Sequence, residues 1–202
     1  MSVHFTDHPL REKIVKEAKK LGIEYKSDCQ FAKLVFKEVP EVIGKFPAGK
    51  RKMKKLHIVN GTILSKPTFY VSHWGKRHYG VVKHDKDNEI YSIIEHSGDT
   101  LFDISVREIN PYDEKNDWVD SDQVKKIKYR SDYKAINDLI KYFKGERIAV
   151  ANRCVSTGSV DSYNLIHNNC HHFASYVATG FWFCFQVEET YAEIVKIAKY
   201  CC

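Results

Sequence analysis

The 202-residue chain contains no CxxC pair, and its six cysteines are irregularly spaced. Structural zinc sites use closely spaced ligand pairs, and disulfide-stapled miniproteins are much shorter, so we expect neither class. The first 20 residues lack the apolar core of a signal peptide. The sequence therefore predicts a protein that is not secreted, with mostly free thiols in a reducing cytoplasm.

Long hydrophobic runs are missing as well. The longest apolar stretch without acidic or basic side chains, residues 173–187, is shorter than the roughly 20 residues of a spanning helix. Hydrophobic residues make up 43% of the chain and charged residues 29%, which is typical of a globular protein. The net charge of +6 favours anionic surfaces, but no nucleic-acid-binding motif accompanies it, so we expect no specific nucleic-acid partner.

Hydrophobic periodicity predicts helices at both ends of the chain and strands between them. The helical patterns cover residues 7–22, 27–39, 131–146, 169–180 and 188–200. The strand patterns cover two hairpins, one turning at Asn60-Gly61 and one spanning residues 78–96, with further strands near 101–106 and over 181–187. This order indicates an α+β fold.

A basic loop with Gly and Pro, residues 44–55, is the expected boundary between two parts of the chain. We predict a helical N-terminal extension over residues 1–55 and a main domain over residues 56–202 that includes a C-terminal helix. The extension would act as a lid, as a partner-binding arm or as a packing element.

The short stretch "HNNCHHFASYVATG" raises the question of what a cysteine does at the start of a helix. Asn169 is a favourable N-cap, so Cys170 falls in the first turn. Unpaired N–H groups and the helix dipole favour an anion there, and a thiolate is the nucleophilic form of cysteine. Cys170 is therefore the candidate nucleophile, and it requires a base from elsewhere in the chain.

The candidate base is His78, which begins the strand "HYGVV", and His96 ends the partner strand in "SIIEH". A cysteine facing two histidines would supply a nucleophile, a base and an orienting group. His84, in the turn, and His73, in "SHWGK", are rivals for these histidine roles.

"HYGVV" followed by "YNLIHNNCHHF" resembles the lecithin:retinol acyltransferase-like family, which includes the H-rev phospholipid acyltransferases and resembles the H-box/NC proteins of some picornaviruses. The resemblance implies a permuted NlpC-type, papain-like fold, in which an antiparallel sheet packs against the helix that carries the nucleophile. It also implies that Cys170 is the nucleophile, His78 the general base and His96 the orienting residue. The chain departs from the pattern in two ways: His171 replaces the usual Glu, and the two histidines are 18 residues apart, further than usual.

The resemblance implies a thiol-dependent acyltransferase or phospholipase A that acts on glycerophospholipid esters through a cysteine thioester and needs no cofactor. The alternatives are an inactive regulatory protein of this fold, of developmental or viral type, and a cysteine peptidase or amidase. The acyl acceptor is left open. The partner expected from this interpretation is a phospholipid surface, which a peripheral protein would contact. The basic side chains Lys50, Arg51, Lys52, Lys54 and Lys55 would either touch its anionic headgroups or form a solvated loop, and the aromatic run near residue 181 would form either an interfacial patch or a buried strand. Lipidation of Cys201 and Cys202 is left open.

Overall fold

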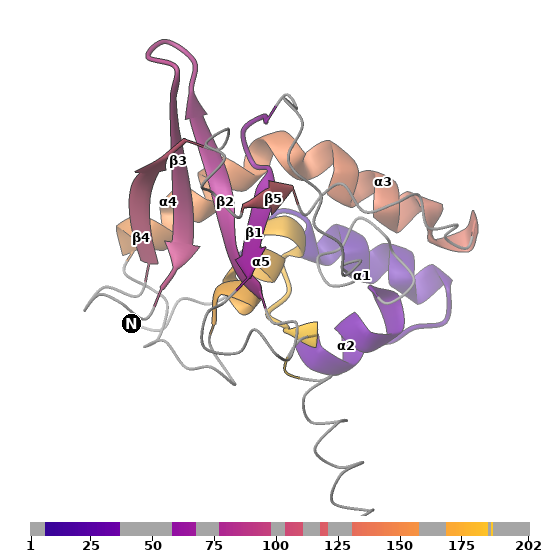
Figure 1. Cartoon of the computed structure of the whole chain (residues 1–202). Coiled ribbons are helices and arrows are strands. Elements are labelled where there is room, and N and C mark those ends of the chain that lie inside the picture. The colour runs from indigo at the N-terminus through magenta and orange to yellow at the C-terminus, as the bar shows by residue number, and fades with distance from the viewer. Residues whose placement is uncertain are drawn as a thin grey trace, which may run out of the picture.

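The computed structural model of the chain describes residues 7–36, 58–67, 77–97, 104–110, 118–120, 131–157, 169–185 and 187. In these residues an antiparallel five-stranded sheet packs against helices (Figure 1), which confirms the α+β class. The strands are β1 (Ile63–Pro67), β2 (Arg77–Asp85), β3 (Ile90–His96), β4 (Ile104–Ile109) and β5 (Val119–Asp120). The α-helices are α1 (Arg11–Lys20), α2 (Asp28–Val35), α3 (Lys134–Tyr142), α4 (Arg147–Thr157) and α5 (Cys170–Thr179), and the 3-10 segments are η2 (Ser131–Tyr133) and η3 (Phe143–Glu146).

The strands follow the order β4-β3-β2-β1-β5, and each neighbouring pair is antiparallel. The predicted hairpin over residues 78–96 is confirmed: β2 and β3 pair up to Asp85 opposite Ile90. The Asp85 carboxylate accepts the N–H groups of Asp87 and Asn88 and closes the turn. This turn decides which side chains share a face, since a slip of one residue would exchange the two faces.

Helix α5 packs against β2 and β3, and α4 packs against β2 (Figure 1). Side chains from the sheet and from both helices form the main hydrophobic core, which includes Tyr79, Val81, Ile94, Val150, Phe173 and Val177. Strand residues of the other parity form a smaller cluster with Leu64, Val82, Ile93 and Trp118. The helix that carries the candidate nucleophile therefore lies on the sheet, as predicted.

Helix α5 begins and ends where its sequence predicts. The Asn169 side-chain oxygen accepts the N–H groups of His171 and His172, and His172 Nδ1 accepts the N–H of Asn169, which completes a capping box. At the other end Gly180 adopts a φ of 84°, in the left-handed region that favours glycine. Cys170 is therefore the first residue of the helix.

The N-terminal helices α1 and α2 lie beside α5 (Figure 1), and buried residues of all three helices belong to the same hydrophobic core. Phe31 of α2 stacks on Phe181, just after α5, with ring centroids 4.8 Å apart. The helices predicted within residues 7–22 and 27–39 are confirmed, although the first begins only at Arg11. Within the part of the chain that the structure describes, no helix is long and apolar enough to cross a membrane.

The hairpin predicted around Asn60-Gly61 is wrong. Ile58 and Val59 are not in a strand, and β1 pairs with β2 instead. Gly61 adopts a φ of 79°, and a Cβ there would lie 2.0 Å from the carbonyl oxygen of Lys144. The Asn-Gly turn is therefore shaped by its contact with η3 and not by a hairpin.

The strand predicted for residues 181–187 is also wrong, because residues 181–184 follow α5 as irregular chain and Phe185 is helical. Their rings fill the core beside α2: Phe183 stacks on Phe36 with centroids 5.1 Å apart. The predicted C-terminal helix, the basic loop with its five cationic side chains and the paired C-terminal cysteines lie outside the described residues. The division at residue 55 stays a prediction.

Candidate active site

His78 of β2 and Glu95 of β3 point to the same face of the sheet. Continued by one pair beyond Val81 and Ile94, the hairpin register places Glu95 opposite Gly80, diagonally from His78. His78 Nε2 lies 2.7 Å from Glu95 Oε2. The side chains of His78 and Glu95 are only 15% and 5% exposed, so this contact is largely shielded from water.

Arg107 of β4 binds the other side of the same carboxylate. Its Nε donates to Glu95 Oε1 at 2.6 Å, and its Nη2 approaches Oε2 at 3.4 Å. Burial raises the pKa of Glu95, but the hydrogen bonds from His78 and Arg107 outweigh it and leave that pKa below its usual value. Trp118 packs beside this group, with its ring centroid 5.8 Å from that of His78. Glu95 is thus an ionised carboxylate with two cationic partners.

Cys170 approaches His78 from the start of α5. Its thiol is within hydrogen-bonding reach of the imidazole, and the residue is only 4% exposed. Burial lowers the pKa of His78, but the hydrogen bonds with Cys170 and Glu95 and their negative charges raise it to about 9. The imidazole is therefore protonated near neutral pH and connects the cysteine to the carboxylate.

Of the three predicted site residues, the structure brings Cys170 and His78 together. His96 follows Glu95 in β3, so its side chain points to the opposite face, where it is completely buried. The carboxylate of Glu95 makes the contact with His78 that we expected from His96. The sequence signal for Glu95 was its parity in "SIIEH", which becomes usable once the hairpin register is known.

Of the two rival histidines, the structure describes only His84, and it lies away from this site. His84 lies six residues along β2 from His78, which is about 20 Å in a strand. The His84 ring stacks on Tyr91 with centroids 4.1 Å apart, and the backbone N–H of His84 donates to Asn60 Oδ1. His73 lies outside the described residues.

His171, which replaces the glutamate of the family pattern, is completely buried. Its ring lies 4.6 Å from the ring of Tyr79, so it packs between α5 and β2. Among the described residues, no group of three His, Cys, Asp or Glu side chains is arranged to hold a metal ion.

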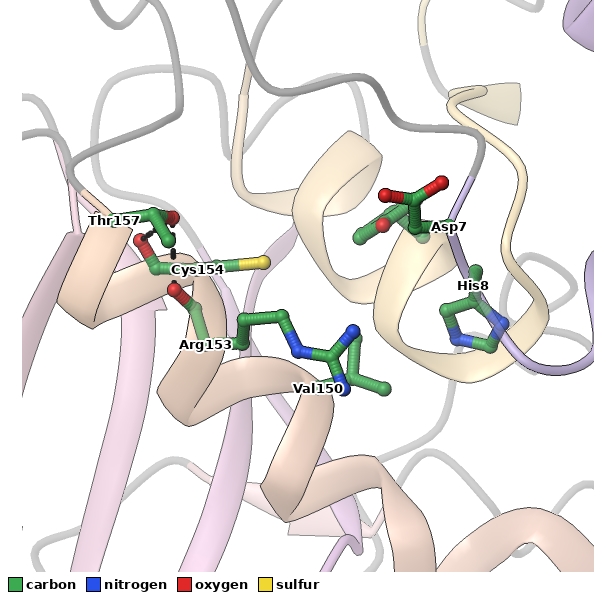
Figure 2. Close-up of a pocket in the computed structure, with 7 residues that line it drawn as sticks. Asp7, His8, Val150, Arg153, Cys154 and Thr157 are labelled. Atoms are coloured by element: carbon green, nitrogen blue, oxygen red, sulfur yellow. Dashed lines mark hydrogen bonds between the residues drawn. The ribbon is translucent and has the colours of Figure 1, made fainter.

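A cavity of about 40 Å³ lies between α4, α5 and the segment before α1 (Figure 2). Its lining includes Cys154, whose pKa is raised by burial to about 11, and the side chain of Arg153. A cavity needs roughly 10–15 Å³ of such volume to hold a single water. This cavity therefore has room for a few waters and not for an acyl chain. None of the residues that line it belongs to the Cys170–His78–Glu95 group.

A buried thiol, an imidazolium and an ionised carboxylate in contact are the components of an enzyme with a cysteine nucleophile. The family model described as lecithin retinol acyltransferase matches residues 63–182, which include all three side chains. The chain therefore belongs to that family, and its domain is acyltransferase-like. Neither the curated proteins nor the solved structures give a significant match.

Proposed function

We propose that the chain is a thiol-dependent acyltransferase or phospholipase A that cleaves glycerophospholipid esters through a thioester on Cys170. The observation that supports this most strongly is the contact of His78 with both Cys170 and the buried carboxylate of Glu95. The family supports acyl transfer as the class of reaction. The phospholipid donor follows from the resemblance noted above.

In the first step the Cys170 thiolate attacks the ester carbonyl carbon, and the carbonyl electron pair moves onto oxygen. The tetrahedral intermediate then collapses, and the bond to the alcohol oxygen of the lysophospholipid breaks. His78, protonated at neutral pH, donates its proton to that leaving oxygen. The products of this step are a lysophospholipid and an acyl thioester on Cys170.

The oxyanion requires hydrogen-bond donors near the start of α5. Asn169 already accepts three of the first four helical N–H groups: those of His171 and His172 through its side chain, and that of Phe173 through its carbonyl. We therefore assign the N–H of Cys170 as the oxyanion donor from the helix. A second donor is not assigned.

In the second step water or an acyl acceptor attacks the thioester. His78, now neutral, takes the proton of the attacking group, and the Cys170 thiolate leaves. Glu95 stabilises the imidazolium in both steps and keeps the ring oriented, while Arg107 holds Glu95. Water gives phospholipase A activity, and an amine, an alcohol or a lysolipid gives acyl transfer.

The test is intact-mass spectrometry after incubation with phosphatidylcholine vesicles, with Cys170→Ala and His78→Ala as controls. We expect an acyl adduct on the wild type that hydroxylamine removes and that is absent from Cys170→Ala. His78→Ala should form it at least about a hundredfold more slowly, because the acid that protonates the leaving group is lost.

Two other outcomes separate the alternatives. If Cys170 reacts rapidly with iodoacetamide at neutral pH but forms no lipid adduct, the lipid substrate is wrong, and peptide or amide substrates follow. If Cys170 reacts no faster than a thiol in a short peptide, the enzyme proposal fails in favour of a regulatory protein of the same family.

A further inference from the structure

The chain that follows α5 contacts the first turn of that helix. The Trp182 ring stacks on the His172 ring at a centroid distance of 5.8 Å and an interplanar angle of 22°. Asn169 Nδ2 donates to Cys184 Sγ at 3.7 Å. Asn169 and His172 are the two members of the capping box that surrounds Cys170. The segment 182–184 therefore supports the turn on which the candidate nucleophile lies.

The N-terminal helices hold this segment in place. The backbone N–H of Trp182 donates to Asp28 Oδ2 at 2.7 Å. Arg11 donates to both oxygens of the same carboxylate, at 2.6 and 3.2 Å, and to the carbonyl oxygen of Gly180 at 2.7 Å. The Arg11 guanidinium also lies 4.6 Å from the centroid of the Phe181 ring. One partly buried ion pair thus fixes residues 180–182.

A second contact from the same N-terminal segment reaches α5 directly. His8 Nε2 donates to the carbonyl oxygen of Val177, and His8 Nδ1 accepts the N–H of Leu10. Figure 2 shows the His8 ring beside α5. The match to the family model begins at residue 63, so His8, Arg11 and Asp28 lie outside the part of the chain that it covers.

We propose that Asp28 is a positioning residue for Cys170, which it reaches through Trp182 and the His172–Asn169 cap. This inference rests on the proposed function for its catalytic consequence. A thiol that must meet an imidazole and a carbonyl carbon tolerates little displacement, since a misplacement of about 1 Å costs up to about a hundredfold in rate. The N-terminal extension therefore helps to position the Cys170 thiol.

The experiment measures alkylation of Cys170 by iodoacetamide at pH 6 and pH 9, resolved by peptide mass because other free thiols are present. The rate at pH 6 is divided by the rate at pH 9. A change in the access of iodoacetamide to the thiol alters both rates equally and cancels in this ratio. The ratio therefore reports the pairing of Cys170 with the His78 imidazolium. The full-length chain is compared with Asp28→Ala and Asp28→Asn. Glu17→Gln is the matched control, since it removes an exposed ion pair with Lys20 on α1.

We expect Asp28→Ala to lower the pH 6 to pH 9 rate ratio about tenfold. Asp28→Asn retains an oxygen that can accept the Trp182 N–H, so its loss should be smaller, and Glu17→Gln should match the wild type. All rates are measured below the melting temperature of each variant. If Asp28→Ala does not fold, Asp28→Asn alone must show a lower ratio.

An unchanged ratio with a lower melting temperature would mean that Asp28 has only a structural role, and the inference would fall. Alkylation requires no lipid, so this result does not depend on the substrate. If the wild type turns over phosphatidylcholine, kcat should fall with the ratio while KM stays unchanged. If it does not, the proposed reaction fails while the test of positioning still stands.

Discussion

One histidine from another segment lies beside each end of helix α5, His78 near its start and His8 near its end, and their pKa values shift in opposite directions. At the N-terminal end, contacts with Cys170 and Glu95 overcome burial and raise the pKa of His78 to about 9. At the C-terminal end, burial together with the positive charges of Arg153, Arg11 and Arg147 lowers the pKa of His8 to about 4. Burial lowers the pKa of both histidines, and only at His78 do anionic partners reverse its effect.

This difference matches the groups that each end of the helix presents. The start of α5 presents N–H groups and the positive end of the dipole, which suit a thiolate and an oxyanion. The other end presents carbonyl oxygens, and neutral His8 and cationic Arg11 donate to those of Val177 and Gly180. The first end is therefore suited to the proposed attack by a thiolate, whereas the contacts at the second end fix its position.

The largest effect is expected at the N-terminal end, from Glu95→Gln. The amide keeps the size of the side chain but removes the negative charge that stabilises the His78 imidazolium. We expect kcat/KM for ester cleavage to fall by about a thousandfold, measured by release of lysophospholipid from phosphatidylcholine vesicles.

The control for this change is His96→Asn at the neighbouring position, measured with its melting temperature. His96 is completely buried, so we expect His96→Asn to lower the melting temperature clearly. The kcat/KM of the folded enzyme should change much less. A larger kcat/KM loss in His96→Asn than in Glu95→Gln would return the orienting role to His96.

The neighbours Glu95 and His96 show how far sequence reasoning extends. The pattern of "HYGVV" and "SIIEH" predicted two paired strands, and the structure has them. Which face each side chain occupies depends on the register, and the register depends on how many residues the turn after Asp85 contains. A difference of one residue exchanges the faces, so the residue type favoured His96 while the geometry favours Glu95.

Elsewhere in the fold, too, local sequence signals predicted the structure, whereas tertiary contacts were not predictable. Helix α5 was predictable because its signals are local: Asn169 at one end and Gly180 at the other. The segment over residues 181–187 was not, because a run of aromatic residues suits a strand, and only tertiary packing against α2 decides otherwise. The contacts of Arg11 with Gly180 and of Asp28 with Trp182, just after α5, join residues more than 150 positions apart, and no local pattern indicates them.

At the C-terminal end the largest effect is expected from His8 as the pH falls. Its folded pKa of about 4 lies below the ordinary value of 6.5, so the unfolded chain binds the proton first. Neutral His8 contributes about 3 kcal/mol to the free energy of unfolding. This contribution is complete above pH 6.5 and is lost as the pH falls to about 4. Urea denaturation between pH 7 and pH 4 measures it.

His8→Gln is the comparison, because glutamine can still donate to the Val177 carbonyl but does not titrate. We expect the difference in unfolding free energy between wild type and His8→Gln to shrink steadily as the pH falls from 7 to 4. Parallel curves for the two proteins would show that His8 does not control acid stability.

A smaller effect is expected from Gly180→Ala at the same end. Alanine is strained at a φ of 84°, and its Cβ would lie 2.8 Å from His8 Cγ and Nδ1. Together these should lower the unfolding free energy by about 2 kcal/mol. In the double mutant with His8→Ala the two ring contacts disappear, whereas the contact with the Cβ of residue 8, at 3.0 Å, and the backbone strain remain, so only part of the loss should return. Full recovery would mean that the ring contacts alone were responsible.

The smallest effect is expected at the site again, from Arg107→Gln. Arg107 helps to keep the pKa of Glu95 low, so its removal should raise that pKa and move the acid limb of kcat/KM to higher pH. The Arg107 side chain is 47% exposed and water screens its charge, so we expect a loss of about tenfold at pH 6 and less at pH 8. Lys134→Gln on α3 removes the same charge from an exposed ion pair and serves as control. An equal shift in Lys134→Gln would indicate a general effect of net charge, whereas a shift confined to Arg107→Gln would show that the Arg107–Glu95 contact tunes the N-terminal end of α5.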